Sequence, residues 1–313
     1  MDSIVALAGG VGGARMADGL AQILPPDKLT IIVNTGDDFE HLGLKICPDL
    51  DTVCYTLAGV SNSHTGWGRE GETWEALRIL GELGGPTWFN LGDRDLGLHL
   101  ERTRRLNQGE PLSQVTQSFC QSLGVGPKVI PMSDDPTPTI VQVEGGELSF
   151  QEYFVKRQCD PRVKGFRFEG MEQAHPAPGV MEAIRQSDLV LICPSNPWVS
   201  VDPILAVPGI SAAVRERFVI AVSPIIGGQT VKGPAAKMYT ELGIEPSALA
   251  VADHYADLLA GFVLDHVDLN QASMVEKLGI RPLVTNALMK NRRERRRLAS
   301  EVIEFGSKLA IKS

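Results

Sequence analysis

The chain has 313 residues, of which 43% are hydrophobic and 22% are charged. These proportions are typical of a globular protein that can bury a sizeable core. The net charge of −8 argues against a general nucleic-acid binder, which would carry a basic surface. No apolar run approaches the roughly 18 residues needed to cross a bilayer, and the N-terminus lacks the basic region of a signal peptide. With five scattered cysteines and no CxxC pair, we expect a cytoplasmic protein without membrane or nucleic-acid partners.

Short apolar runs alternate with helical patterns along much of the chain. Strands are expected over 3–9, 29–35, 87–93, 188–196, 218–224 and 248–254, and helices over 14–24 and 73–83. The apolar runs are continuous rather than alternating, which is typical of parallel strands covered by helices on both faces. The order of strand and then helix predicts an α/β fold, a Rossmann-like domain with a doubly wound, mostly parallel sheet.

The middle of the chain has a different pattern. Two alternating runs within 138–154 meet at Gly145-Gly146, which predicts a hairpin. Residues 163–170 add a short extended segment. We therefore expect a small antiparallel β insertion at 131–175, with 1–130 and 176–313 forming the Rossmann-like domain.

The C-terminal segment is strongly basic between Lys290 and Arg297. Such a run is most often the solvated face of a helix. Contact with nucleic acid is the alternative, but no aromatic residue or motif accompanies the run.

A glycine-rich turn, AGGVGGAR, joins the first expected strand to the first helix. Gly9, Gly10, Gly12 and Gly13 would let backbone N–H groups approach an anion at the helix N-terminus, and Arg15 could reach a phosphate. The turn is neither a Walker A sequence nor GxGxxG. A tight structural turn with Arg15 facing solvent is therefore the alternative.

An acidic stretch follows the second expected strand. Asp37 and Asp38 come directly after that strand, and Asp49 and Asp51 flank Leu50 further along. Grouped carboxylates suit Mg²⁺ beside substrate phosphates, so we expect Asp37, Asp38 and Asp49 to bind the metal. Asp49 or Asp51 could take a proton from a substrate hydroxyl, whereas Asp51 could instead cap the next helix.

A third polar loop, FNLGDRDL, follows the expected strand at 87–93. It contains Asn90, and it places Arg94 between Asp93 and Asp95. We assign Asn90 and Arg94 to substrate binding. A local ion pair between Arg94 and its neighbours is the alternative.

Two more polar loops follow later strands. Ser195 and Asn196 lie on a proline-stiffened turn that could bind a base or ribose, and Ser223, Gly227 and Lys232 suit phosphate. Ligands of open α/β sheets bind beyond the carboxyl ends of the strands, so all these loops are expected at one site. No GxSxG elbow is present, which favours positioning and charge neutralisation of phosphates over covalent catalysis.

Taken together, these motifs closely resemble those of the CofD/FbiA family. The resemblance rests on AGGVGGAR, VNTGDDFEHLGLKICPDLDTVCYTLAG, LGDRDL, PMSDDP, PSNPWVSVDPIL and SPIIGGQTVKGPAAKM, which follow the family order from Ile4 to about Asp265. The family transfers a phosphorylated three-carbon acid unit to a deazaflavin during coenzyme F420 biosynthesis. The resemblance implies a guanosine diphosphate-linked donor of 2-phospholactate or phosphoenolpyruvate, the deazaflavin Fo as acceptor, release of GMP, Mg²⁺ and a homodimer. The product would be F420-0 or its dehydro form.

The resemblance also implies roles for individual residues. Asp51 in PDLD matches a deazaflavin-contacting Asp, and Asn90 matches a second acceptor position at which archaeal members carry Lys. The first glycine turn has the form of the bacterial branch, for which phosphoenolpyruvate is the expected unit.

Two other functions are weighed against the transferase. A non-catalytic nucleotide-sugar-binding regulator of the YvcK type would share the fold, but it would not need the acceptor motifs PDLDTV and LGDRD. A dinucleotide-dependent oxidoreductase would need GxGxxG and a ribose-binding acid where Asn34 and Thr35 stand.

Overall fold

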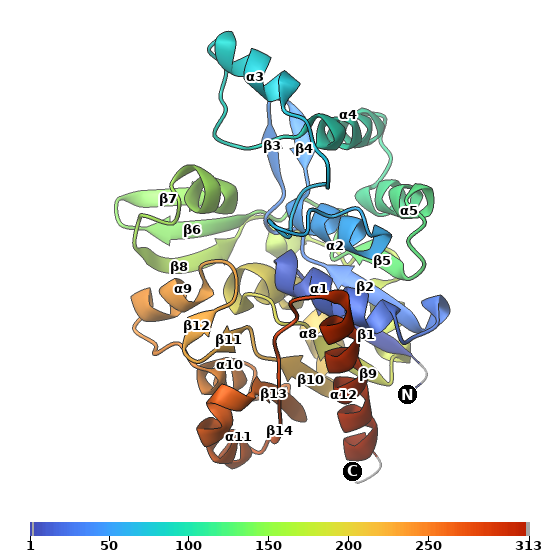
Figure 1. Ribbon diagram of the computed structural model, residues 1–313, viewed down its shortest axis with the longest axis vertical. Coiled ribbons are helices and arrows are strands. Elements are labelled where there is room, and N and C mark those ends of the chain that lie inside the picture. Colours follow the sequence, from blue (N-terminus) through green and yellow to red (C-terminus); the bar gives the residue numbers. More distant parts are fainter. Residues whose placement is uncertain (2, 311–313) are drawn as a thin grey trace.

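The computed structural model describes residue 1 and residues 3–310. A seven-stranded parallel sheet forms the centre of the protein (Figure 1). Its strand order is β14-β13-β10-β9-β1-β2-β5. These strands are β1 Ile4–Ala8, β2 Leu29–Val33, β5 Lys128–Pro131, β9 Leu189–Ile192, β10 Val219–Val222, β13 Gly261–Asp265 and β14 Arg281–Thr285. Along the chain, β2 and β5 are added on one side of β1, and β9, β10, β13 and β14 are then added on its other side. The doubly wound fold is therefore confirmed, with its switch point between β1 and β9, where such sheets bind ligands.

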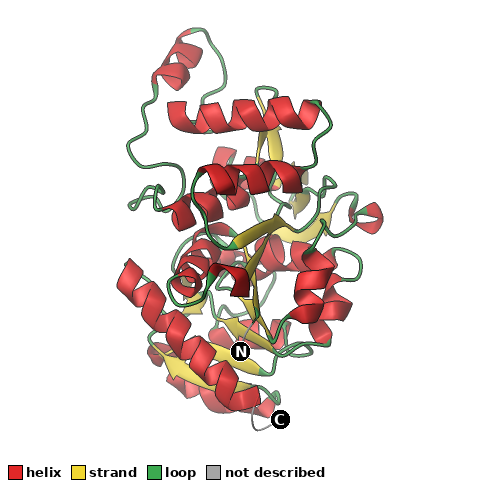
Figure 2. Ribbon diagram, turned by 90° about the vertical axis from the view of Figure 1, so that its right-hand side faces the viewer, coloured by secondary structure: helices red, strands yellow, loops and turns green. Residues whose placement is uncertain are grey.

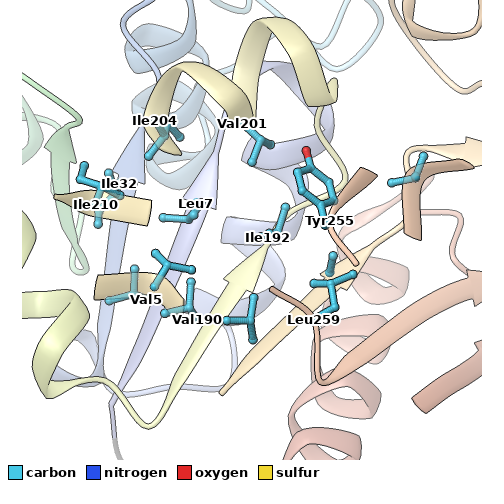
Figure 3. Packing of buried hydrophobic residues seen from close by; sticks show 14 of the residues in the cluster. Val5, Leu7, Ile32, Val190, Ile192, Val201, Ile204, Ile210, Tyr255 and Leu259 are labelled. Carbon is cyan, nitrogen blue, oxygen red and sulfur yellow. The ribbon is translucent and has the colours of Figure 1, made fainter. Parts of the chain in front are cut away.

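Helices cover both faces of the sheet because successive strand residues point to opposite sides. Val5 and Leu7 of β1 face one layer, which Figure 3 shows with side chains from α7 and α8. That layer contains α6 Val180–Gln186, α7 Asp202–Ala206, α8 Ile210–Arg215, α10 Ala248–His254 and α11 Ala272–Lys277. Ile4 and Ala6 face the other layer, which contains α1 Gly10–Ala21, α2 Pro48–Ala58, α5 Leu112–Ser122 and α12 Arg292–Ala310.

Small antiparallel sheets lie outside this core. The largest has the order β7-β6-β8 and contains β6 Thr139–Val143, β7 Gly146–Ser149 and β8 Val163–Phe168. It includes the expected hairpin and extended segment, whereas the boundaries of a separate insertion stay a prediction. Two further hairpins are β3 Phe39–His41 with β4 Leu44–Ile46, and β11 Ile225–Ile226 with β12 Gln229–Thr230.

The remaining helices lie mainly around the ends of the strands. They are α3 Glu75–Glu82, α4 Asp93–Asn107 and α9 Ala235–Glu241, with short turns η1 Pro26–Lys28, η2 Glu152–Lys156, η3 Met171–Gln173, η4 Pro197–Val201 and η5 His266–Gln271. The α3 helix lies at one end of the molecule and α12 at the other (Figures 1 and 2). Within the described residues, no helix combines the length and apolar character needed to cross a membrane.

Two of the expected strands are wrong. Residues 87–92 form a loop that leads into α4, which begins at Asp93, and residues 248–254 form α10. Periodicity cannot separate a short apolar strand from a buried helical turn. Here the Ser247 hydroxyl accepts a hydrogen bond from the Ala250 N–H at 3.0 Å and so caps the helix. The strand that completes this part of the sheet is β13.

Candidate active site

A cavity of about 550 Å³ opens at the carboxyl ends of β1, β2, β9 and β10. Most of the residues predicted from the sequence line it: Gly9, Gly10, Gly12, Arg15, Asp37, Asp49, Asp51, Asn90, Ser195, Asn196, Ser223 and Lys232. The others, Gly13, Asp38, Arg94 and Gly227, lie outside its lining. The switch point of the sheet therefore gathers loops that are far apart in the sequence.

The glycine turn packs tightly against its neighbours. The Gly10 N–H donates to Asp49 Oδ1 at 2.7 Å, and the Ser195 hydroxyl donates to the Gly9 carbonyl at 2.8 Å. A Cβ at Gly9 would lie 2.6 Å from Asp49 Oδ2, and one at Gly12 would lie 2.0 Å from the Pro194 carbonyl oxygen. Only glycine allows this approach, which holds the N-terminus of α1 at the cavity. The free N–H groups of the first helical turn suit an anion there.

Two carboxylates share one amide donor in the cavity wall. Asn34 Nδ2 lies 3.2 Å from Asp37 Oδ1 and 3.0 Å from Asp49 Oδ2, and Gln151 Nε2 donates to Asp37 Oδ2 at 3.2 Å. Burial, and then the charge of Asp49, raises the pKa of Asp37 well above its usual value, and burial raises the pKa of Asp49 to about 6. These two carboxylates therefore lack the positive charge that would compensate their burial.

A divalent cation fits this pair. Among the described residues, no group of three His, Cys, Asp or Glu side chains could hold a metal ion. Mg²⁺ does not need such a cage, because it is usually bound by one or two carboxylates together with water and substrate phosphates. Asp37 and Asp49 would hold the ion, and each of their oxygens keeps a lone pair beyond its protein hydrogen bond.

Asp38 does not join the predicted metal ligands. The two residues lie at a turn that the Asp38 N–H closes by donating to the Thr35 carbonyl at 3.2 Å, and only Asp37 lines the cavity. Its neighbours are Lys45, Cys47 and Arg102, and burial raises its pKa to about 7. The sequence spacing alone did not reveal this difference.

Asp51 forms a buried ion pair with Arg102. Arg102 NH1 donates to Asp51 Oδ2 at 3.1 Å and NH2 donates to Oδ1, while NH1 also lies 3.2 Å from His99 Nδ1. Burial lowers the pKa of His99 to about 4, so its ring is neutral at pH 7. Asp51 is thus oriented by Arg102, with oxygens that can still accept a substrate hydroxyl.

Arg102 and His99 were not predicted from the sequence. Both lie on α4, and their spacing of three residues places them on one face of that helix. The sequence signal that could have indicated a cation here was the carboxylate of Asp51, because a buried charge needs a partner.

Aromatic side chains also line the cavity. They are Phe89, Phe150, Phe154 and Trp67. The Phe150 and Phe154 rings are stacked with centroids 5.5 Å apart. Such faces suit a planar ring system. These residues were also missed, because aromatic residues on separate loops form no local pattern.

Two cations, Arg15 and Lys232, also line the cavity. Burial and then Arg295 lower the pKa of Arg15, and burial and then Arg15 lower the pKa of Lys232. Lys232 Nζ donates to the Thr65 carbonyl oxygen, and within the described part of the chain neither cation has an ion-pair partner. Unpaired like charges in a cavity favour a bound anion.

Several predicted residues form contacts within or between the loops. The Ser223 hydroxyl donates to the Ile225 carbonyl at 2.7 Å, and Asn196 Oδ1 accepts the Trp198 N–H at 3.1 Å. The Gly227 N–H donates to Asp268 Oδ2 at 3.1 Å. A Cβ at Gly13 would lie 2.8 Å from Ser195 Oγ, and Arg94 NH1 donates to the Glu70 carbonyl at 3.1 Å. These contacts fix the loops, and Asn196 and Ser223 also line the cavity.

Comparisons with known proteins show the family of this chain. A family model described as 2-phospho-L-lactate transferase CofD matches residues 4–298. A phosphoenolpyruvate transferase of Streptomyces griseus is 48% identical over 286 residues, which cover 89% of this chain and 90% of that protein. A 2-phospho-L-lactate transferase of Methanococcoides burtonii is 38% identical over 302 residues, which cover 96% of this chain and 99% of that protein. A UPF0052 family crystal structure from Bacillus halodurans shares the fold at 16% identity, with a TM-score of 0.63, covering 96% of this chain and 98% of that one. The chain belongs to the CofD family of 2-phospho-L-lactate transferases.

Proposed function

We propose that the protein transfers a phosphoenolpyruvyl or 2-phospholactyl unit from a guanosine diphosphate-linked donor to the ribityl hydroxyl of the deazaflavin Fo and releases GMP. Membership of the CofD family makes it a transferase of F420 biosynthesis. Relatives at 48% identity are phosphoenolpyruvate transferases, whereas the 2-phospho-L-lactate transferase of Methanococcoides burtonii is 38% identical. This difference favours the enolpyruvyl unit.

One observation carries the proposal: aromatic side chains, carboxylates and cations line a single cavity. The aromatic side chains and Asp51 suit a planar acceptor that carries hydroxyl groups. The glycine turn, Arg15 and Lys232 suit a diphosphate. Asp37 and Asp49 lie in the same cavity, as transfer between the two substrates requires.

The acceptor would stack its ring on Phe89, Phe150 and Phe154. Its ribityl chain would then extend toward Asp51, where Arg102 fixes the two carboxylate oxygens. Asn90, which also lines the cavity, would bind another polar group of the acceptor. These contacts orient the attacking hydroxyl.

The donor diphosphate would lie at the N-terminus of α1 between Arg15 and Lys232. The hydroxyl oxygen of Fo forms a bond to the distal phosphorus, and the bond from that phosphorus to the bridging oxygen breaks. GMP leaves with the electron pair, and Asp51 or Asp49 receives the hydroxyl proton. Mg²⁺ held by Asp37 and Asp49 would neutralise phosphate charge during this step.

A transfer assay tests the proposal directly. Purified protein is mixed with Fo, Mg²⁺ and each guanylylated donor, and the product is identified by mass spectrometry. We expect a deazaflavin adduct whose mass identifies the donated acid. Asp51→Asn should lower turnover with Fo by about 10-fold or more, as for loss of a charged hydrogen bond, while binding of the donor nucleotide stays unchanged.

Glu40→Gln provides the matched control, because Glu40 is an exposed carboxylate of the same acidic stretch. Glu40→Gln should leave both turnover with Fo and binding of the donor nucleotide unchanged. Absence of product with either donor, although the nucleotide binds, would refute the transferase and favour a non-catalytic nucleotide-binding role. Unchanged kinetics of Asp51→Asn would remove Asp51 from the acceptor site.

A further inference from the structure

A second, smaller cavity of about 260 Å³ lies beside the main one. Arg15 lines both cavities, and the loop that separates them contributes Thr65 to the main cavity and Gly66 to the second one. The two cavities are therefore neighbours, with the Arg15 side chain at their common wall.

The second cavity has an excess of positive charge. Three guanidinium groups, Arg15, Arg292 and Arg295, line it together with a single carboxylate, Asp18. Asp18 is 2% exposed and accepts from Arg292 Nε at 3.3 Å and from Arg295 NH1 at 3.1 Å. Arg295 Nε is buried without a hydrogen-bond partner, and Arg15 has no ion-pair partner in the described part of the chain. One carboxylate thus faces three cations.

Close packing of two helices holds these arginines in place. Arg295 is on α12, which lies directly on α1 because Gly19 has no side chain. A Cβ at Gly19 would lie 2.4 Å from the Arg295 carbonyl oxygen. The rest of the lining is small and polar, including Thr56, Ser61 and Asn62, and it contains no aromatic residue. The cavity therefore suits a small anionic group and offers no stacking surface for a base.

We infer that Arg15 and Arg295 hold the carboxylate of the donated three-carbon acid in the second cavity. The inference rests on the proposed function. In the donor, this carboxylate is attached to the carbon that bears the distal phosphate oxygen, so it lies close to the diphosphate bound in the main cavity. Arg15 can contact the diphosphate from one side and the carboxylate from the other. The cation beside Asp51 is Arg102, and it is already paired with that carboxylate.

The test changes one residue and one substrate group. Transfer to Fo is measured for the natural donor and for an analogue in which a methyl group replaces the carboxylate, the isopropenyl or isopropyl ester of guanosine diphosphate. The enzyme is compared with its Arg295→Gln and Arg295→Lys variants. Arg296→Gln is the matched control, because Arg296 is an exposed neighbour on the same helix that is absent from the cavity lining.

We expect Arg295→Gln to lower kcat/KM for the natural donor by about 10- to 100-fold, the usual effect of losing a charged hydrogen bond. The loss with the methyl analogue should be less than about threefold. Arg295→Lys should recover part of the preference for the natural donor over the methyl analogue. Arg296→Gln should change kcat/KM for either donor by no more than about twofold.

Two results separate the inference from the proposed function. If Arg295→Gln lowers transfer from both donors by the same factor, Arg295 has only a structural role and the inference is wrong while the proposed function stands. If the unaltered enzyme transfers neither unit to Fo, the proposed function fails and the inference fails with it.

Discussion

Removal of Arg102 should leave Asp51 as an uncompensated charge inside the protein. The Arg102 side chain is 4% exposed and that of Asp51 is 11% exposed. Breaking a buried ion pair by deleting one partner costs about 3–5 kcal/mol. Because Asp51 keeps some exposure at the cavity, we expect Arg102→Met to lower the free energy of unfolding by about 3 kcal/mol, near the lower end of that range. Met keeps the unbranched apolar stem of the side chain, so the change mainly removes the charged guanidinium group.

Urea unfolding at pH 7.5 measures this loss, and Arg104→Met supplies the control. Arg104 pairs with Glu101 on the surface of the same helix, and its removal should cost no more than about 1 kcal/mol. Asp51→Asn combined with Arg102→Met should be less destabilising than the sum of the single changes by about 2 kcal/mol. A loss below about 1 kcal/mol for Arg102→Met, or additive effects in the double variant, would refute the buried-pair reasoning.

Three further predictions concern the same region. Gly9→Ala should lower kcat/KM for transfer at least about tenfold, because overpacking costs about 1–3 kcal/mol and the new methyl would lie 2.6 Å from a carboxylate oxygen. The control is Gly97→Ala, at an exposed helix position with open space, which should leave kcat/KM unchanged. Equal losses for the two variants would refute the overpacking argument. Asp37→Asn should remove Mg²⁺-dependent turnover, whereas Asp38→Asn should keep it, and the reverse pattern in a metal titration would contradict the placement of these side chains. The pKa of His99 is lowered to about 4 from a usual 6.5, so the unfolded chain binds the His99 proton more tightly than the folded protein does. The contribution of neutral His99 to the free energy of unfolding is therefore complete above pH 6.5 and is lost as the pH falls toward 4. Relative to His99→Asn, the unaltered protein should lose about 2 kcal/mol between pH 6.5 and 5; parallel pH profiles in urea unfolding would refute this.

The parallel sheet could be predicted because its strands carry a signal within a few residues. Buried strands such as β2 and β9 are continuous apolar runs, and each is followed by polar residues at its carboxyl end. Since these ends meet at one edge of a parallel sheet, Asp37 and Ser195 could be placed near one another without knowing any tertiary contact.

Contacts between distant elements left no such signal. Arg102 lies 51 residues after Asp51 in the chain, and nothing local in LERTRR distinguishes it from the exposed Arg104. The direction of Asp38 depends on the turn into β3, a hairpin that the sequence analysis did not predict. The helix at 248–254 was mistaken for a strand because seven apolar and polar residues fit either structure. The errors therefore lie where tertiary packing, rather than local pattern, decides.

Asn34 shows how one position of this fold has been adapted to a different chemistry. Dinucleotide-binding proteins place an acid at the end of the second strand, where it binds a ribose hydroxyl. Asn34 occupies that position here, and its amide donates toward Asp37 and Asp49 and toward the Val199 carbonyl at 3.1 Å. An acid at this position would repel both carboxylates and leave that carbonyl without a donor. The amide instead holds the two carboxylates side by side at the switch point, as binding of a cation and a diphosphate requires and binding of a ribose does not.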